Sequence, residues 1–149
     1  MRAVAQRVLR ARVDVEGETV GEMQEGLLAL VGVAREDGPT DARQLAAKLV
    51  HLRIFEDAKG RMNLSLLETG GCLGVVSQFT LLGDVRKGRR PAFAEAAPPE
   101  QAEPLVEAVI AEARSLGAPV ITGRFQARME VELLNEGPVT ILLDTQRRF

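Results

Sequence analysis

The chain has 149 residues, of which 46% are apolar and 27% are charged, and its formal net charge is −2. This length fits one domain with a substantial core. The slightly negative charge argues against a protein that coats nucleic acid non-specifically. The presence of one cysteine excludes an internal disulfide and favours a reducing compartment. Because no apolar run approaches the roughly 20 residues that span a bilayer, we expect a cytoplasmic protein without membrane contact.

Metal chemistry is also disfavoured. The chain has a single His and a single Cys, which provide no paired spacing for metal ligands. We therefore expect no metal site and no cofactor. The lone thiol, Cys72, begins an apolar run and has no His placed to activate it, so a small core side chain is favoured over a catalytic one.

The first part of the chain predicts three strands. Residues 2–16 are rich in Val and end in an alternation of apolar and polar residues, which is typical of a half-buried strand. After a turn at Gly17, a second strand is expected over Thr19–Met23. The continuous apolar run Gly26–Ala34 is short enough to be a fully buried strand.

A helix is predicted next, over residues 40–52, because Leu recurs there at helical spacing. Thr40 is expected to cap its N-terminus, with Asp41 in the first turn. A charged turn then leads to a short extended segment, Asn63–Leu67. The central strand of the domain is expected over Cys72–Thr80.

The second half of the chain predicts a long loop, a second helix and two final strands. Gly83–Pro99 is polar, basic and proline-containing, and loops of this length are often functional. The clearest helix follows, with Pro104 in its first turn and Gly117 at its end. Strands are expected over Met129–Leu133 and Val139–Leu143, with a Gly-Pro turn between them.

Together these elements predict one α/β domain over residues 1–149. The links between consecutive strands are short, so the pairing should be mainly antiparallel. We expect the strands to form a sheet or a barrel-like core that packs against two main helices.

Polar side chains gather where the central strand ends, in the segment SQFT at residues 77–80. They are either satisfied groups at an ordinary strand end or the floor of a site in which N–H groups and hydroxyls hold a carbonyl oxygen. A nucleophilic Thr80 would need a base. The only histidine, His51, lies off the apolar face of its helix, so a Ser/Thr-His-Asp triad is disfavoured.

Two further motifs carry possible chemistry. Basic residues concentrate just after SQFT, and in a chain of negative net charge this cluster is a candidate contact for phosphates. A Gly-Pro pair between strands is often only a turn. Its peptide bond can also be cis, and Gly has no Cβ, so the pair can present a rigid backbone surface to a small substrate. The cluster comprises Arg86, Lys87, Arg89 and Arg90, and the pair is Gly137-Pro138.

The sequence closely resembles the D-aminoacyl-tRNA deacylase family over nearly its whole length. The motifs SQFTL and NEGPVT, in this order and at this separation, are highly specific for that family. Other stretches that carry the resemblance are QRVLRARVDVEGE, GLLALVGV, RIFEDAKGRMNLSL, RRPAF and TGRFQARMEV.

The resemblance implies hydrolysis of the ester that joins a D-amino acid, or glycine mischarged on tRNA-Ala, to the 3′ end of tRNA. It implies a homodimer whose site lies at the subunit interface, where a cis Gly-Pro pair from one subunit excludes L-amino acids from the pocket of the other. It also implies that the 2′-hydroxyl of the terminal adenosine assists catalysis. The residues that map to the site are Ser77, Gln78 and Thr80 for catalysis, Phe79, Gly137 and Pro138 for substrate binding, and Arg7 as a support for the pair.

Two alternatives stay open at this point. Thr80 can be a true nucleophile that forms a covalent acyl intermediate, or the chain can be a tRNA-binding module without hydrolytic activity. The negative net charge argues against the binding module.

Overall fold

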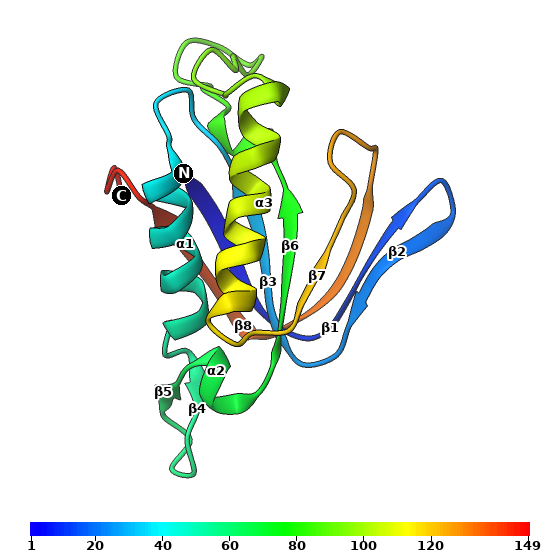
Figure 1. The fold of residues 1–149 in the computed structure, drawn as a ribbon, viewed down its shortest axis with the longest axis vertical. Coiled ribbons are helices and arrows are strands. Elements are labelled where there is room, and N and C mark those ends of the chain that lie inside the picture. The colour runs from blue at the N-terminus through cyan, green and yellow to red at the C-terminus, as the bar shows by residue number, and fades with distance from the viewer.

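A curved six-stranded sheet carries two long helices on one face in the computed structural model, which describes residues 1–149 (Figure 1). None of the helices combines the length and the hydropathy that a membrane-spanning helix needs. The elements follow the chain in the order β1 (Arg2–Val15), β2 (Glu18–Met23), β3 (Gly26–Gly32), α1 (Pro39–His51), β4 (Phe55–Glu56), β5 (Met62–Leu64), α2 (Leu66–Thr69), β6 (Cys72–Ser77), the 3₁₀ turn η1 (Phe79–Leu82), α3 (Pro99–Ser115), β7 (Val120–Thr122) and β8 (Glu130–Asp144).

The long first strand, β1, organises the sheet. It pairs antiparallel with β2 and β3 on one side and with β8 on the other, while β6 pairs parallel with both β3 and β7. β2 and β7 approach each other without forming a ladder, so the sheet is a nearly closed barrel. The predicted α/β class and barrel-like core are confirmed, and the two parallel pairings of β6 add to the expected antiparallel ones.

Two apolar clusters lie on the two faces of the sheet. The larger cluster packs α1 and α3 against the sheet and includes Leu49 and Val109, one from each helix, both fully buried. The smaller cluster fills the inside of the curve. Neighbouring residues of β3 divide between them, with Leu27 in the larger and Leu28 in the smaller, because successive strand residues point to opposite faces.

The alternation along β1 is interrupted in its middle. Gln6 pairs with Thr140 and Val8 pairs with Asn135, so residues 136–139 of β8 lie opposite Arg7 alone. This excursion is a large bulge in an edge strand, and bulges bend the strand and redirect side chains. The predicted turn between two separate strands is wrong, because both halves of β8 continue along the same partner strand.

The two main helices are confirmed, with corrections at their starts. The cap of α1 is Gly38 and not Thr40; the Gly38 N–H donates to the Asp41 carboxylate at 3.0 Å, which satisfies one of the free donors at the helix start. α3 begins at Pro99, so the placement of Pro104 in its first turn is wrong. Pro99 itself occupies the first turn, where a missing N–H costs little.

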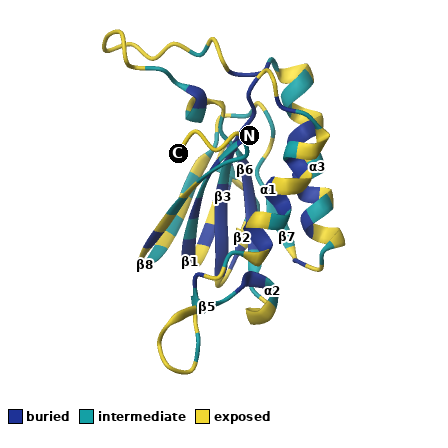
Figure 2. Ribbon diagram, turned by 90° about the vertical axis from the view of Figure 1, so that its left-hand side faces the viewer, coloured by how far each residue is buried: buried dark blue, intermediate teal, exposed yellow.

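The central strand is shorter than predicted. β6 ends at Ser77, and the following residues turn into η1. Three short elements, β4, α2 and β7, were not predicted, because two to four residues are too few to show a periodic pattern. The predicted loop after residue 83 contains no helix or strand before α3, and it forms much of the exposed surface at the top of Figure 2.

The register between β3 and β6 depends on Gly26. A Cβ at this position would lie 1.9 Å from the Cys72 carbonyl oxygen, which belongs to the neighbouring backbone and cannot yield. Gly26→Ala should therefore lower the free energy of unfolding by about 3 kcal/mol or more, at the upper end of overpacking costs. Urea unfolding measures this value. Gly38→Ala is the control, since its Cβ meets no atom within 4 Å; equal losses in the two variants would contradict the register.

Candidate functional site

A cavity of about 580 Å³ opens where β6 leaves the sheet. Its walls come from the ends of β3 and β6, the first two turns of α3 and the segment that leads into β8. Most of the lining is apolar, and the polar groups come from Ser77, Gln78 and Gln126. The lining residues are Val31, Val33, Val76, Ser77, Gln78, Phe79, Ala97, Pro99, Ala102, Val106, Phe125, Gln126, Ala127, Met129 and Val131.

The polar end of β6 follows from a change of backbone direction. The Gln78 N–H donates to the Val31 carbonyl at 2.7 Å, after which the chain turns into η1. Leu82 is buried and anchors this turn, while Phe79 and Thr80 stay exposed. The Gln78 side-chain amide donates to the Thr80 hydroxyl oxygen. The turn therefore presents the Ser77 hydroxyl and the Gln78 amide to the cavity, whereas Thr80 lies outside the lining and contacts it through the Gln78 amide.

An aromatic ring stands at the edge of the cavity. Phe79 is 58% exposed and contacts Phe93 edge-on, with 5.0 Å between the ring centroids. Phe125 lines the same cavity and also packs against the main core. Exposed rings of this kind stack on nucleobases and on other flat ligands.

No side chain is placed to activate Thr80 as a nucleophile. The one hydrogen-bond partner of its hydroxyl is the Gln78 amide, which is a donor and not a base. His51 is exposed on α1, as predicted, and lies outside the cavity lining. Burial raises the pKa of the Cys72 thiol, which disfavours the reactive thiolate. No group of three or more His, Cys, Asp or Glu side chains is arranged to hold a metal ion.

The Gly137-Pro138 pair forms the outer part of the bulge in β8. Its peptide bond is cis, and Gly137 has φ +113°, a region that favours glycine. Both residues are exposed, while Arg7 behind them is only 4% exposed. Arg7 donates from Nη1 to the Ile54 carbonyl at 2.7 Å, and its Nε lies 3.1 Å from Glu136 as an ion pair without hydrogen-bond alignment.

Asn135 closes the base of the bulge. Its side-chain Nδ2 donates to the Arg7 carbonyl at 2.9 Å and to the Val139 carbonyl at 3.0 Å. These bonds satisfy one backbone carbonyl on each of the two strands beside the bulge. Arg7 and Asn135 together hold the pair outward, and Asn135 was not singled out from the sequence.

The structure does not bring the two motifs together within one chain. Ser77 lies beside Val31, near the Arg2 end of β1, whereas the bulge lies opposite Arg7. Val31 pairs with Ala3, and the stretch of β1 from Ala3 to Arg7 is roughly 13 Å long at about 3.3–3.4 Å per residue. Thr80 and Gly137 therefore lie at separate places along the sheet, one near the start of β1 and the other beside its middle.

The basic cluster is exposed, but its members differ. Arg86 donates to the Asp84 carboxylate through Nε at 2.9 Å and through Nη2 at 2.7 Å. Its positive charge is therefore largely balanced by a neighbour in the same loop. Lys87, Arg89 and Arg90 form no ion pair and are the free cations of the cluster.

Comparisons with known proteins give matches that extend over nearly the whole chain. The family model described as D-Tyr-tRNA(Tyr) deacylase matches residues 4–144. A D-aminoacyl-tRNA deacylase of Anaeromyxobacter dehalogenans is 62% identical with full coverage of both chains, and that of Heliobacterium modesticaldum is 58% identical over 97% of this chain and 96% of the relative.

Solved structures share the same fold. The "c-Myc DNA Unwinding Element Binding Protein" superposes with a TM-score of 0.92 and 38% identity, covering 97% of this chain and 99% of that one. A probable eukaryotic D-amino acid tRNA deacylase superposes with a TM-score of 0.82 at 20% identity, covering 95% and 97%. The class defined by the family match is that of hydrolases acting on ester bonds. Within it, the chain belongs to the D-aminoacyl-tRNA deacylase family.

Part of the cavity was not identified from the sequence. Phe125, Ala127 and Met129 line it from the segment before β8; the sequence analysis named Met129 only as a strand residue, and Phe125 and Ala127 only within a family-like stretch. The available signal was Phe125 itself, one of five Phe residues in the chain, set between Arg124 and Arg128. Placing it at the SQFT end requires the pairing of β6 with β7, which the sequence does not reveal.

The Asp84–Arg86 pair predicts an unusual titration. Hydrogen bonds from the Arg86 side chain and N–H lower the pKa of Asp84 from an ordinary 3.8 to about 2. Because the pKa is lowered in the folded protein, the ion pair stabilises the folded loop fully above pH 3.8. This stabilisation is lost as the pH falls through about 2. NMR titration of the carboxyl carbon should give this midpoint, and Arg86→Ala should return it towards 3.8. Lys87→Ala is the control and should leave it low; an unshifted midpoint in the unaltered chain would disprove the pairing in solution.

Proposed function

We propose that the chain hydrolyses the ester that joins a D-amino acid to the 3′ end of tRNA, in the cytoplasm. The observation that carries this proposal is the full-length identity of 62% with a D-aminoacyl-tRNA deacylase. The cavity at the end of β6 supports it, because its apolar walls and two Phe rings suit a terminal adenosine, and its polar mouth suits an ester.

The ester would lie against the polar residues of the turn. Hydrolysis passes through a tetrahedral intermediate with a negative oxygen, which fixed N–H and O–H donors stabilise. Gln78 and Thr80 are such donors, and Ser77 adds a hydroxyl at the cavity wall. Since no base contacts Thr80, we assign it to positioning of the ester, and we assign assistance of the attacking water to the 2′-hydroxyl of the terminal adenosine.

Selection for the D configuration would come from a second subunit. In a homodimer the Gly137-Pro138 pair of each subunit enters the cavity of the other, where a rigid backbone wall leaves no space for an L side chain. Glycine has no side chain to exclude, so glycine mischarged on tRNA-Ala would be hydrolysed as well. The separation of Thr80 from Gly137 within one chain supports a site completed between subunits.

The exposed edge strand β8 is evidence in favour of the proposed homodimer. β8 is 15 residues long and pairs with β1 alone, which leaves its outer backbone groups without strand partners. Leu134 and Leu142 are 41% and 58% exposed. Figure 2 colours most of β8 as exposed or half-buried. Long edge strands with exposed apolar side chains are sites of association between chains.

The activity is tested with matched tRNAs that carry D-Tyr, L-Tyr or glycine. We expect release of free D-Tyr and glycine but not of L-Tyr, measured as acid-soluble amino acid. Thr80→Ala should keep part of the activity, with a loss on the order of 10-fold to 100-fold for one lost polar contact in the transition state. An acyl group trapped on Thr80 would instead establish the nucleophile alternative, and binding without release would establish the binding module.

Gly137→Ala tests the backbone wall. The new Cβ would lie 2.8 Å from Val139 Cγ2 and 3.0 Å from the Val139 nitrogen, so the bulge must shift. We expect turnover of the D substrate to fall at least about 10-fold, since small displacements at a reacting centre are costly. Gly117→Ala is the matched control, with a similar φ of +106° but no atom within 4 Å of its Cβ. Equal activities of the two variants would show that the Gly137-Pro138 pair is not part of the active site.

The free cations of the loop predict the salt dependence of tRNA binding. Replacing Lys87, Arg89 and Arg90 with Gln should reduce the slope of log K against log salt by roughly 2, at about 0.7–0.9 per lost phosphate contact. Filter binding at several salt concentrations measures the slope. A control with the same loss of charge is the replacement of three exposed cations elsewhere, Arg43, Lys48 and Lys59, with Gln. If both sets change the slope equally, the loop has no specific role.

A further inference from the structure

The side chain of Arg2, in β1, joins three other parts of the molecule. Its Nη1 donates to the Leu81 carbonyl of η1 at 3.1 Å. Its Nε lies 3.4 Å from Oδ2 of Asp144 at the end of β8, and its Nη2 lies 3.5 Å from Oε2 of Glu95 in the segment before α3. The guanidinium group uses a different nitrogen for each contact, which its planar fork of donors allows.

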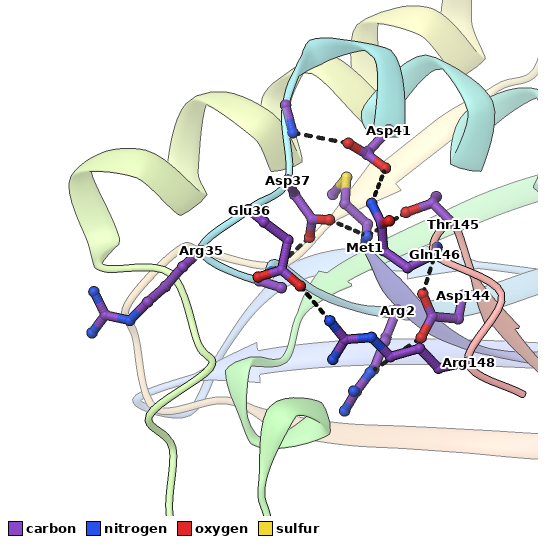
Figure 3. A network of polar contacts seen from close by, with 12 residues as sticks. Met1, Arg2, Arg35, Glu36, Asp37, Asp41, Asp144, Thr145, Gln146 and Arg148 are labelled. Carbon is purple, nitrogen blue, oxygen red and sulfur yellow. Dashed lines mark hydrogen bonds and ion pairs between the residues drawn. The ribbon is translucent and has the colours of Figure 1, made fainter.

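The contact with Asp144 fixes the guanidinium group. The Asp144 side chain is only 2% exposed, and Arg2 is the one cation within ion-pair distance of its carboxylate. Glu95 is 45% exposed and shares its carboxylate with Arg148, which also pairs with Glu36, as Figure 3 shows for Arg148 and Glu36. Because a buried pair is screened by solvent and salt much less than an exposed one, Asp144 holds Arg2 more firmly than Glu95 does.

The turn η1 rests on the neighbouring backbone and receives its hydrogen bond from Arg2. Gly32, which pairs with Arg2 across β3 and β1, contacts the turn closely. A Cβ on Gly32 would lie 2.7 Å from Cδ2 of Leu82 and 2.9 Å from the Gln78 carbonyl oxygen. Leu81 lies near the end of η1, where the last carbonyls of a helical turn lack partners within it. Arg2 therefore satisfies a free carbonyl and ties the turn to the sheet.

This turn carries groups of the candidate site. Phe79 lines the cavity, and the Thr80 hydroxyl accepts a hydrogen bond from the Gln78 amide, which also lines it. Arg2 is not part of the cavity lining and reaches the turn through the Leu81 carbonyl. Small displacements at a reacting centre are costly in rate, so a contact that fixes the backbone of η1 can affect catalysis without touching the substrate.

We infer that Arg2 is a positioning residue for the reaction: held by the buried Asp144 carboxylate, it fixes η1 and thereby the places of Phe79 and Thr80. The strand that carries the Gly137-Pro138 bulge thus also anchors the turn at the cavity of its own subunit. The inference deepens the proposed function, and its kinetic part rests on that function.

The first test follows the turn itself and needs no activity. The full chain is labelled with 4-fluorophenylalanine, which gives one fluorine NMR resonance for each of its five Phe residues. The resonance of Phe79 is assigned by its loss in Phe79→Leu. In Arg2→Met we expect this resonance to shift or broaden. The matched control, Arg12→Met, removes another ion-paired arginine of β1 and should leave it unchanged. An unchanged Phe79 resonance in folded Arg2→Met would overturn the inference.

The second test separates rate from binding. In single-turnover release of D-Tyr from its tRNA, Arg2→Met should lower the rate constant about 10-fold. The Kd for tRNA, measured by filter binding, should change less than about 2-fold, because a positioning residue acts on the reacting centre. An unchanged rate constant, or a loss confined to Kd, would overturn the inference. A chain that releases no D-Tyr in any form would refute the proposed function, and the NMR test would then decide the role of Arg2.

A double variant keeps the test decisive if Arg2→Met does not fold, since that change leaves the Asp144 carboxylate buried without a countercharge. Arg2→Met combined with Asp144→Asn removes both charges and should fold. Asp144→Asn alone keeps the hydrogen bond from Arg2 to the Leu81 carbonyl. We therefore expect the double variant to react about 10-fold more slowly than Asp144→Asn. Equal rates and equal Phe79 resonances in these two variants would overturn the inference.

Discussion

The structure depends on hydrogen bonding along both sides of one strand. β1 pairs with β8 on one side and with β3 and then β2 on the other, so almost every backbone group over 14 residues has a partner within the sheet. The helices, the barrel curvature and both apolar clusters are arranged around this strand. The largest interruption of its pairing, opposite Arg7, is also where Gly137 and Pro138 leave the sheet.

Two features of the candidate site are placed at separate positions along β1, near its start and beside its middle. Near Arg2, β6 ends in SQFT one strand beyond β3, where the cavity opens, and near Arg7 the edge strand β8 projects a surface made of backbone. A single rigid ladder therefore sets the separation of the two motifs. Sites placed on regular elements are held more precisely than sites on free loops, and here η1 and the bulge are both anchored directly to strands.

The sequence was informative where a pattern repeats over many residues. The strands at 2–16 and 19–23 and the two long helices were found within a few residues, because their apolar residues keep one period. The elements that the sequence did not predict are short or depend on contacts between distant parts of the chain. β7 has three residues, η1 has four, and the continuity of β8 through Gly137 depends on its pairing with β1 and on two hydrogen bonds from Asn135. The motif SQFT was found, but its opposite wall at Phe125 depends on long-range packing that no local pattern records.

The pairing of Arg2 with Asp144 has a consequence for synthesis on the ribosome. The last strand emerges after nearly all of the chain, roughly 7–30 s after the first at about 5–20 residues per second. Until then β1 has one unpaired side, and the chain can bury its helices against a sheet that is still incomplete. Long-range pairing of this kind slows folding. The contact between the Thr145 N–H and the Met1 carbonyl can form only when this last strand docks.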